Sequence, residues 1–357
     1  MSSQQTPLSE LFAVAHNEDG LQRLHINVET ISEILSHHDL KTMRLKGDDR
    51  YLRGHLRKET DEDDSFAFIN ETKHYDGNES PIRRYCIMKV LENLFDTVET
   101  LWVDDYGGRT SARWETAEIH RDEYISIPKQ MYGLMERKND QSKWVVRYQT
   151  WEDGECQITL YTREPQDEVN EVWKAFSDYF IHDGPLMGEC FTPTWKYLKH
   201  QDKQWEDVVL NEEVREKLNL HVVDFFKNLD KYGEVGLRTS RGVILAGKPG
   251  TGKTLTLDII MNEFNDYTRI YATAETLCGR HHIRDMYNVA RKLSPTIVFI
   301  EDIDTIGSSD DDESYRTPLL GEILTALNSV ESNDGVLTIA TTNYPDALDI
   351  ALRDRPG

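Results

Sequence analysis

The C-terminal part of the chain predicts an α/β fold in which a parallel β-sheet is covered by helices on both faces. Short apolar runs of strand length occur at 241–247, 268–273, 296–300 and 335–341. Helical segments separate these runs, at 251–264, 280–293 and 318–330. Strands that are apolar along their whole length and alternate with amphipathic helices are typical of a parallel sheet buried on both faces.

A further helix is predicted at 212–229, just before this alternation. Its apolar residues recur at helical spacing and are expected to form one face: Val214, Leu218, Val222, Phe225 and Leu229. Near residue 200 the sequence pattern changes from an irregular mixture of short elements to a regular alternation of strands and helices. We therefore expect a domain boundary there. Residues 201–357 then form the α/β domain, and residues 1–200 form a separate unit.

Residues 1–200 predict an α+β domain or a pair of subdomains, for which we expect a role in recognising a substrate or partner. Two alternating runs, 143–150 and 156–162, flank Asp153-Gly154 and predict a β-hairpin. A helix is expected at 167–181, where apolar residues follow helical spacing. No catalytic or metal-ligating pattern occurs in this half of the chain.

The amino-acid composition disfavours several classes of function. The 357 residues carry a net charge of −23, which disfavours non-specific binding to nucleic acid or anionic membrane. No apolar run approaches the ~18 residues of a membrane-spanning helix, and the N-terminus lacks a signal-peptide pattern. The four cysteines have no paired spacing, so reduced thiols and a cytoplasmic location are expected. The acidic runs 59–65 and 308–314 are predicted to be solvated loops.

The segment GKPGTGKT at 247–254 fits the phosphate-binding pattern G-x-x-x-x-G-K-[ST] between a strand and a helix. Its glycines let the backbone approach phosphate oxygens, and the helix N-terminus adds its dipole. Lys253 is expected to reach the β- and γ-phosphates, and Thr254 to ligate Mg²⁺. The predicted nucleotide-binding residues are Gly247, Pro249, Gly250, Thr251, Gly252, Lys253, Thr254 and Leu255.

Polar residues follow two other predicted strands. The run IVFIEDID places Glu301 and Asp302 after the strand 296–300, and TIATTN places Asn343 after the last one. One carboxylate is needed to support Mg²⁺ and the other to polarise the attacking water. On strand position we assign Glu301 to the Mg²⁺ side and Asp302 to the water. Asn343 is expected to hold that water and sense the γ-phosphate.

These residues resemble the AAA ATPase family. The segment TTNYPDALDIALRDRPG at 341–357 is similar to that family's second region of homology, and WEDVV at 205–209 is similar to the segment that lies beside the nucleotide. The resemblance implies a P-loop NTPase fold of the AAA+ large-subdomain type. It also implies hydrolysis of ATP with Mg²⁺, a homo-oligomeric ring, usually a hexamer, and chaperone-like remodelling of protein clients.

The resemblance further implies an arginine that crosses from a neighbouring subunit to the γ-phosphate. Arg355 aligns with the first such arginine of the family, and Arg353 is the alternative. The family's second arginine and C-terminal helical lid are expected to be absent, which favours a truncated chain. Members of the family that thread protein chains carry an aromatic residue in a loop at the centre of the ring. The corresponding position here holds Leu277-Cys278-Gly279, without an aromatic residue. The Glu-Asp order resembles the branch that contains the mitochondrial translocase of a folded Rieske protein.

Three other functions remain open at this point. Many ATP-hydrolysing enzymes have aspartate before glutamate at the end of this strand, whereas here Glu301 comes before Asp302. A nucleotide-binding scaffold with little turnover fits this reversed order and the missing lid. A DNA-directed AAA+ machine is opposed by the acidic charge and by the lack of a basic or helix-turn-helix segment. A GTPase is opposed because the guanine-specific Asn-Lys-x-Asp pattern is absent. The preferred hypothesis is an ATP-driven protein-remodelling motor whose client is unknown.

Overall fold

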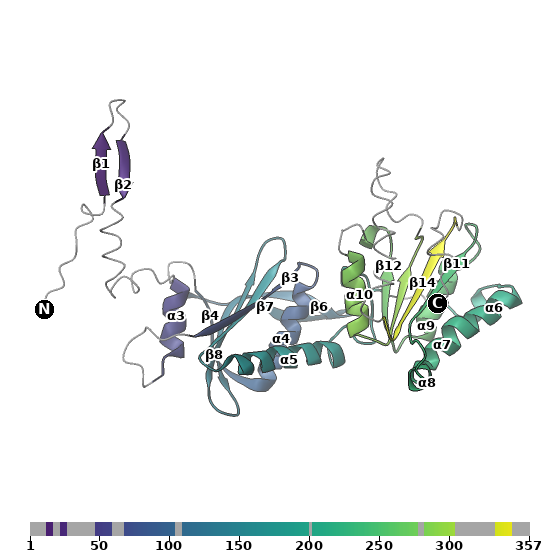
Figure 1. Cartoon of the computed structure of the whole chain (residues 1–357), viewed down its shortest axis with the longest axis horizontal. Helices are drawn as coiled ribbons and strands as arrows, with labels where there is room; N and C mark the ends of the chain where they lie inside the picture. Colours follow the sequence, from purple (N-terminus) through teal and green to yellow (C-terminus); the bar gives the residue numbers. More distant parts are fainter. Residues whose placement is uncertain are drawn as a thin grey trace.

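The computed structural model describes residues 12–16, 22–26, 47–58, 68–103, 109–199, 202–277, 282–303 and 333–344. These ranges exclude both acidic runs, the helix expected at 318–330, Cys278, Gly279, Arg353 and Arg355. The described residues form an N-terminal α+β body and a C-terminal body with a parallel sheet (Figure 1). Among them, no helix combines the length and apolar character needed to cross a bilayer.

The N-terminal body is an antiparallel sheet with helices. Its described elements are β1 (Phe12–His16), β2 (Gln22–Ile26), α3 (Gly47–Leu56), β3 (Ile69–Tyr75), α4 (Ser80–Leu94), β4 (Phe95–Val103), β5 (Arg109–Thr110), β6 (Arg113–His120), β7 (Glu123–Arg137), β8 (Lys143–Thr150), β9 (Cys156–Thr162) and α5 (Gln166–His182). In the described part of the chain, β1 and β2 form a separate two-stranded sheet, and the larger sheet has the order β3-β9-β8-β7-β4-β5 with β6 paired to β7.

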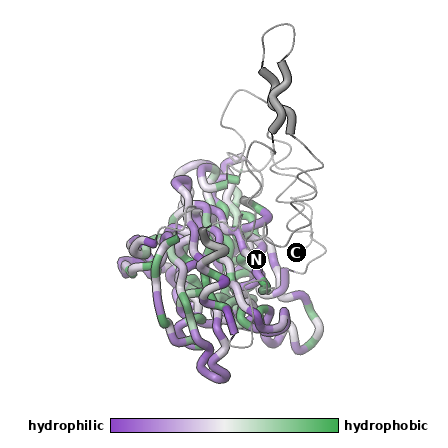
Figure 2. Tube along the Cα trace, turned by 90° about the vertical axis from the view of Figure 1, so that its left-hand side faces the viewer, coloured by the Kyte–Doolittle hydropathy of each residue, from purple (hydrophilic) through white to green (hydrophobic). Residues whose placement is uncertain are grey.

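The expected hairpin is confirmed as β8 and β9, which pair antiparallel from Trp144↔Thr162 to Thr150↔Cys156. Gly154 has φ 88°, a left-handed conformation that suits glycine in the turn. Successive residues of β8 face opposite sides of the sheet. Trp144 and Val146 pack in the core with α4 and α5, whereas Val145 packs with α3. Figure 2 shows hydrophobic stretches inside the folded part and hydrophilic ones at its outer turns.

The C-terminal body contains the predicted parallel sheet. Its described elements are β10 (Cys190–Phe191), a 3-10 turn η2 (Trp205–Asp207), α6 (Glu212–Leu218), a π-helical turn η3 (Asn219–Val223), α7 (Asp224–Lys227), α8 (Leu229–Glu234), β11 (Arg241–Ala246), α9 (Lys253–Glu263), β12 (Thr268–Ala272), a 3-10 turn η4 (Glu275–Leu277), α10 (His282–Lys292), β13 (Thr296–Ile300) and β14 (Val336–Thr342). The sheet order is β10-β12-β13-β14-β11, with every pair parallel.

Both faces of this sheet are covered, as predicted. On β13, Ile297 and Phe299 pack with α9 and with the α6–α7 region, whereas Val298 and Ile300 pack with α10. The edge strand β11 departs from the prediction of full burial, because in the described part of the chain it pairs only with β14. Its residues are therefore partly exposed.

The helix expected at 212–229 is present from Glu212 to Lys227, but it is not a regular α-helix throughout. A π-helical turn interrupts it at Asn219–Val223, and the chain leaves the helical conformation at Asn228. A π-turn inserts an extra residue and rotates the apolar face. Leu218, Val222, Phe225 and Leu229 are buried as expected, whereas Val214 in the first turn of α6 is 43% exposed.

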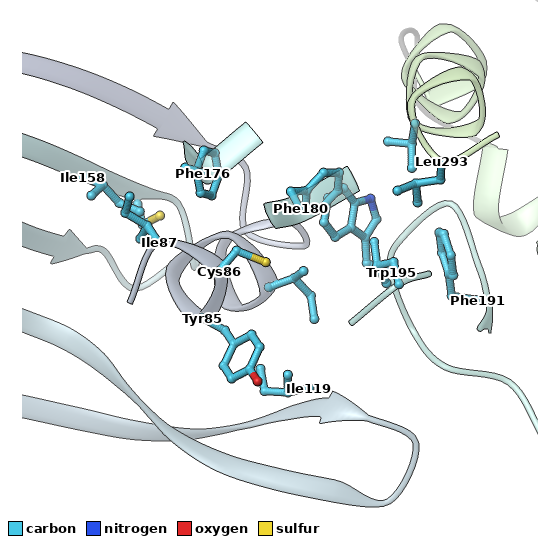
Figure 3. Packing of buried hydrophobic residues seen from close by; sticks show 14 of the residues in the cluster. Tyr85, Cys86, Ile87, Ile119, Ile158, Phe176, Phe180, Phe191, Trp195 and Leu293 are labelled. Carbon is cyan, nitrogen blue, oxygen red and sulfur yellow. The ribbon is translucent and has the colours of Figure 1, made fainter. Parts of the chain in front are cut away.

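The two bodies share one hydrophobic core, which crosses the boundary expected at residue 200. β10 lies before that boundary but pairs with β12 of the C-terminal sheet. Trp195 stacks on Phe180 of α5, with ring centroids 5.8 Å apart, and Figure 3 shows both rings near Leu293 and Phe191. The segment between α5 and residue 199 is thus packed against both bodies.

Candidate functional site

The carboxyl ends of four parallel strands meet at one edge of the sheet. Ala272, Ile300 and Ala340 are aligned across β12, β13 and β14, and Ala246 of β11 aligns with Thr342. The residues that follow these strand ends therefore emerge side by side. They include the phosphate-binding loop after β11, Glu301 and Asp302 after β13, and Asn343 after β14.

The phosphate-binding loop runs from Gly247 to the first turn of α9. Gly250 and Gly252 have φ values of 77° and 85°, which side chains with a Cβ rarely adopt. A Cβ on Gly252 would also lie 3.3 Å from Val208 Cγ2, in the segment that resembles the family's nucleotide-proximal one. The glycines thus allow a loop conformation that leads directly into the N-terminus of α9 at Lys253.

Lys253 is held by hydrogen bonds from its ammonium group. Nζ donates to the carbonyl oxygens of Gly247 and Lys248, at 2.8 and 3.0 Å, and to Asn343 Oδ1 at 2.8 Å. Asn343 Nδ2 in turn donates to Asp302 Oδ1 at 3.2 Å. A line of hydrogen bonds therefore joins the loop lysine, the amide after β14 and one acid of the Glu-Asp pair.

A second line of hydrogen bonds involves the other acid. Thr254 Oγ1 donates to Glu301 Oε1 at 2.7 Å. The Tyr271 hydroxyl, on β12, donates to Glu301 Oε2. Both oxygens of this carboxylate are thus bound by hydroxyl groups, and the two acids of the pair have different partners.

Asp302 adopts an unusual backbone conformation, with φ 46°. Its amide donates to Thr341 Oγ1 at 2.8 Å, and the amide of Ile303 donates to the carbonyl of Thr341 at the same distance. A left-handed conformation in a residue other than glycine costs energy and often occurs at functional sites. Here it turns the chain after β13, and the Asp302 carboxylate lies beside Asn343.

Acidic side chains lie near one another at the carboxyl end of the parallel sheet. Burial, followed by the nearby charge of Glu301, raises the pKa of Asp258 on α9, and Lys203 opposes the shift. Burial, followed by the hydrogen bond to Glu301, also raises the pKa of Tyr271. The tyrosine therefore remains a protonated donor at neutral pH. Concentrated negative charge of this kind attracts a cation.

A pocket of about 620 Å³ lies beside the loop. Apolar residues from the segment before α6, from α6 and from β11 form much of its wall, including Val209, Leu218 and Val243. Gly247, Thr251 and Lys253 line it as well. A pocket of this size with much apolar wall, next to a phosphate-binding loop, can accommodate a ring-shaped group.

The structure brings together most of the residues that the sequence singled out. The loop from Gly247 through Pro249 to Leu255 borders Glu301, Asp302 and Asn343. Thr341 and Tyr271 also contact the acids, but they were not predicted. Tyr271 precedes the last residue of β12, so comparing strand ends in register would have found it. Leu277, at the expected pore-loop position, is buried in the core. Arg353 and Arg355 lie outside the described residues.

Fold and site define a class of protein: a P-loop nucleotide hydrolase, with a phosphate-binding loop on one strand and acids on a neighbouring strand. Residues 243–357 match the family model described as "ATPase family associated with various cellular activities (AAA)". The chain therefore carries an AAA ATPase domain, as the sequence resemblance predicted. This family uses ATP with Mg²⁺.

Curated relatives match a part of the chain. The ATP-dependent zinc metalloprotease FtsH of Metamycoplasma arthritidis is 36% identical over 171 residues, which are 44% of this chain and 22% of the relative. FtsH of Halothermothrix orenii is 35% identical over 169 residues, or 43% and 26% of the two chains. FtsH of Mycoplasmopsis pulmonis is 35% identical over 200 residues, or 51% and 26%. The matched segment thus spans about a quarter of these relatives.

Proposed function

We propose that this chain binds and hydrolyses ATP and couples the reaction to remodelling, unfolding or translocation of protein clients. The observation that carries the proposal is the convergence of the phosphate-binding loop with Glu301, Asp302 and Asn343 at one sheet edge. The AAA domain and the ATP-dependent, protein-degrading relatives support both the nucleotide and the class of client.

The roles of the site residues follow from their contacts. Lys253 binds the β- and γ-phosphates, replacing its present bonds to loop carbonyls with bonds to phosphate oxygens. Asp302 accepts a proton from, or polarises, the attacking water, and Asn343 positions that water from the neighbouring strand. The pairing of Asn343 with both Lys253 and Asp302 supports this division, because one amide contacts the phosphate-binding and the water-activating group.

Thr254 and Glu301 are the proposed Mg²⁺ ligands. Hydroxyl and carboxylate oxygens are the donors that Mg²⁺ prefers, and the two groups are already in contact. In the described ranges no cluster of three or more His, Cys, Asp or Glu is arranged to hold a metal. This fits a cation bound through one carboxylate, with phosphate oxygens and water completing its shell. Bound Mg²⁺ supplies charge neutralisation at the phosphates.

The nucleobase is proposed to occupy the apolar pocket beside the loop. The pocket extends to Gly247 and Lys253, which fix the phosphates, and its apolar wall includes Val209 and Leu218. Burial of the flat faces of a base against aliphatic side chains is favourable at roughly 25 cal/mol per Å² of apolar area.

The remaining parts of the proposal concern assembly. We propose a homo-oligomeric ring of six subunits. In this ring Arg355, or else Arg353, reaches the γ-phosphate bound by the neighbouring subunit. Residues 1–200 are proposed to select the client, and 201–357 to form the motor. A cytoplasmic location remains part of the proposal. The sequence resemblance supports the ring, the arginine and the motor role of 201–357, and the unpaired cysteine spacing supports the location.

A second function, a nucleotide-binding scaffold with little turnover, is favoured by one observation. Asp302 is bonded to Asn343, has a left-handed backbone and has a shorter side chain than glutamate. A base held in this way is less free to approach water within the ~2.6–3.2 Å that proton transfer needs. Turnover therefore has to be measured separately from binding.

Phosphate release from ATP by the chain and by Lys253→Ala tests the main proposal. We expect release by the unmodified protein and its loss in the variant, because the phosphates lose their cation. Lys248→Ala is the matched control, since it removes the side chain of a neighbouring loop lysine that contacts Lys253 through its backbone carbonyl. Equal turnover by Lys253→Ala and the unmodified chain would contradict the proposal. Tight ATP binding without phosphate release would favour the scaffold.

A further inference from the structure

We propose that Tyr271 is a positioning residue that fixes the carboxylate of Glu301 against the Thr254 hydroxyl and thereby sets the affinity of the site for a divalent cation. This inference rests on the proposed function, because it deepens the role given there to Glu301. Tyr271 does not contact the phosphates, and it acts through the acid.

Strand register places Tyr271 at this point. Tyr271 of β12 is aligned with Phe299 of β13, and their rings have centroids 6.5 Å apart. Glu301 is two residues beyond Phe299, so an extended chain directs it to the same face of the sheet. The tyrosine hydroxyl therefore lies diagonally across from the acid, within hydrogen-bonding contact of Oε2.

Because this acid is a glutamate, its carboxylate needs a second hydrogen-bond donor to hold it in place. Glutamate has one more rotatable bond than aspartate, so holding its carboxylate in one place costs more side-chain entropy. Thr254 alone binds only Oε1 and leaves the group free to rotate about that contact. A second hydroxyl on Oε2 fixes the plane of the carboxylate. The remaining lone pairs of both oxygens then stay in a fixed orientation for binding a cation.

Neighbouring charge makes this restraint necessary. Asp258 lies close enough to Glu301 for the Glu301 charge to contribute to its raised pKa. Repulsion between these acids would displace a loosely held carboxylate. The hydrogen bond from the Tyr271 hydroxyl to Glu301 Oε2 opposes that displacement. Groups that orient a metal ligand in this way typically change metal affinity or activity by 10- to 100-fold when removed.

The test is Tyr271→Phe in the 357-residue chain, which removes the hydroxyl and keeps the ring. A fluorescent ATP analogue is titrated with Mg²⁺ at fixed nucleotide concentration, and its affinity is also measured in excess EDTA. We expect the Mg²⁺ concentration at half-saturation to rise about 10-fold or more, with the EDTA affinity unchanged. Tyr287→Phe is the matched control, because it removes another buried tyrosine hydroxyl, bonded to Thr338 Oγ1 at 3.0 Å.

A double-mutant cycle with Glu301→Gln isolates the contact. If Tyr271 acts through Glu301, Tyr271→Phe produces no further change in Mg²⁺ half-saturation once Glu301 is replaced. An unchanged half-saturation in Tyr271→Phe alone, an equal loss of affinity in EDTA and in Mg²⁺, or additive effects in the cycle would overturn the inference. Phosphate release is a separate readout. Its absence in a chain with Mg²⁺-dependent binding defeats the turnover proposal, whereas the inference is decided by the binding data.

Discussion

Lys253 and Asn343 are hydrogen-bonded, Nζ to Oδ1 at 2.8 Å, although Lys253 begins α9, Asn343 follows β14 and the two are 90 residues apart in the sequence. The same amide donates to Asp302 through Nδ2. One side chain therefore contacts both the cation that is proposed to bind phosphate and the acid that is proposed to activate water. A change at the phosphate can reach the acid through a single amide.

The first prediction concerns this amide. Asn343→Ala should lower the rate of phosphate release by about 10²-fold, the effect typical of removing one preorganised donor from a reacting centre. ATP affinity should change much less, because Lys253 retains its other contacts. Single-turnover release and equilibrium binding measure the two effects. Asn333→Ala is the control, since that side chain binds Arg291 near the opposite end of β14. Equal losses of rate in both variants would contradict the prediction.

The second prediction separates the two acids. Asp302→Asn should slow hydrolysis more than it weakens ATP binding, because it removes the base but leaves Glu301 with Thr254. Glu301→Gln should chiefly weaken Mg²⁺-dependent binding, because it removes the charge beside Thr254. Both variants are measured for phosphate release and for nucleotide affinity with and without Mg²⁺. The opposite pattern would exchange the two roles.

The sequence predicted those parts of the site that depend on local pattern. Glycine spacing identifies the loop around Lys253, and strand ends locate Glu301, Asp302 and Asn343. Tyr271 was missed because its contact depends on the register between β12 and β13, with 30 residues separating the pair. Local pattern also missed β10, since Cys190–Phe191 is too short to show strand periodicity. The π-helical turn after Leu218 was missed because apolar spacing favours a continuous helix.

The third prediction concerns the connection between the two bodies. Trp195 is 8% exposed, stacks on Phe180 and lies 5.0 Å from the Arg83 guanidinium. Trp195→Ala should destabilise the protein by about 3–5 kcal/mol, as for other buried tryptophans. Because the shared core is weakened at this point, we also expect one thermal unfolding transition to become two. Calorimetry measures both effects.

Trp114→Ala provides the control for that prediction. Trp114 lies on β6 and is 47% exposed, so truncating its side chain does not create a buried cavity. Its loss should change stability little and leave the shape of the transition unchanged. A single transition in Trp195→Ala, at the temperature of the unmodified chain, would show that this contact does not join the two bodies.

A buried cation in the N-terminal body provides the basis for the fourth prediction. Arg84 is 1% exposed and donates to the carbonyl of Pro128 at 2.7 Å and to Glu115 Oε1. Lys129 lies 3.3 Å from the other carboxylate oxygen. Burial raises the pKa of Glu115, but the hydrogen bonds and charges of Arg84 and Lys129 outweigh it. The pKa in the folded protein is therefore below its ordinary value of 4.5.

Glu115→Gln should lower the thermal unfolding midpoint at pH 7, because Arg84 then remains buried without its carboxylate. A carboxyl group whose pKa is lower in the folded state stabilises the protein fully above 4.5, and this contribution is lost as the pH falls through the folded pKa. The difference between variant and unmodified chain should therefore shrink below pH 4.5. Glu213→Gln is the control, since Glu213 pairs with Lys217 on the exposed surface of α6 and such pairs contribute little. A difference that stays constant from pH 7 to pH 3 would show that Glu115 stabilises the body by packing and not by its charge.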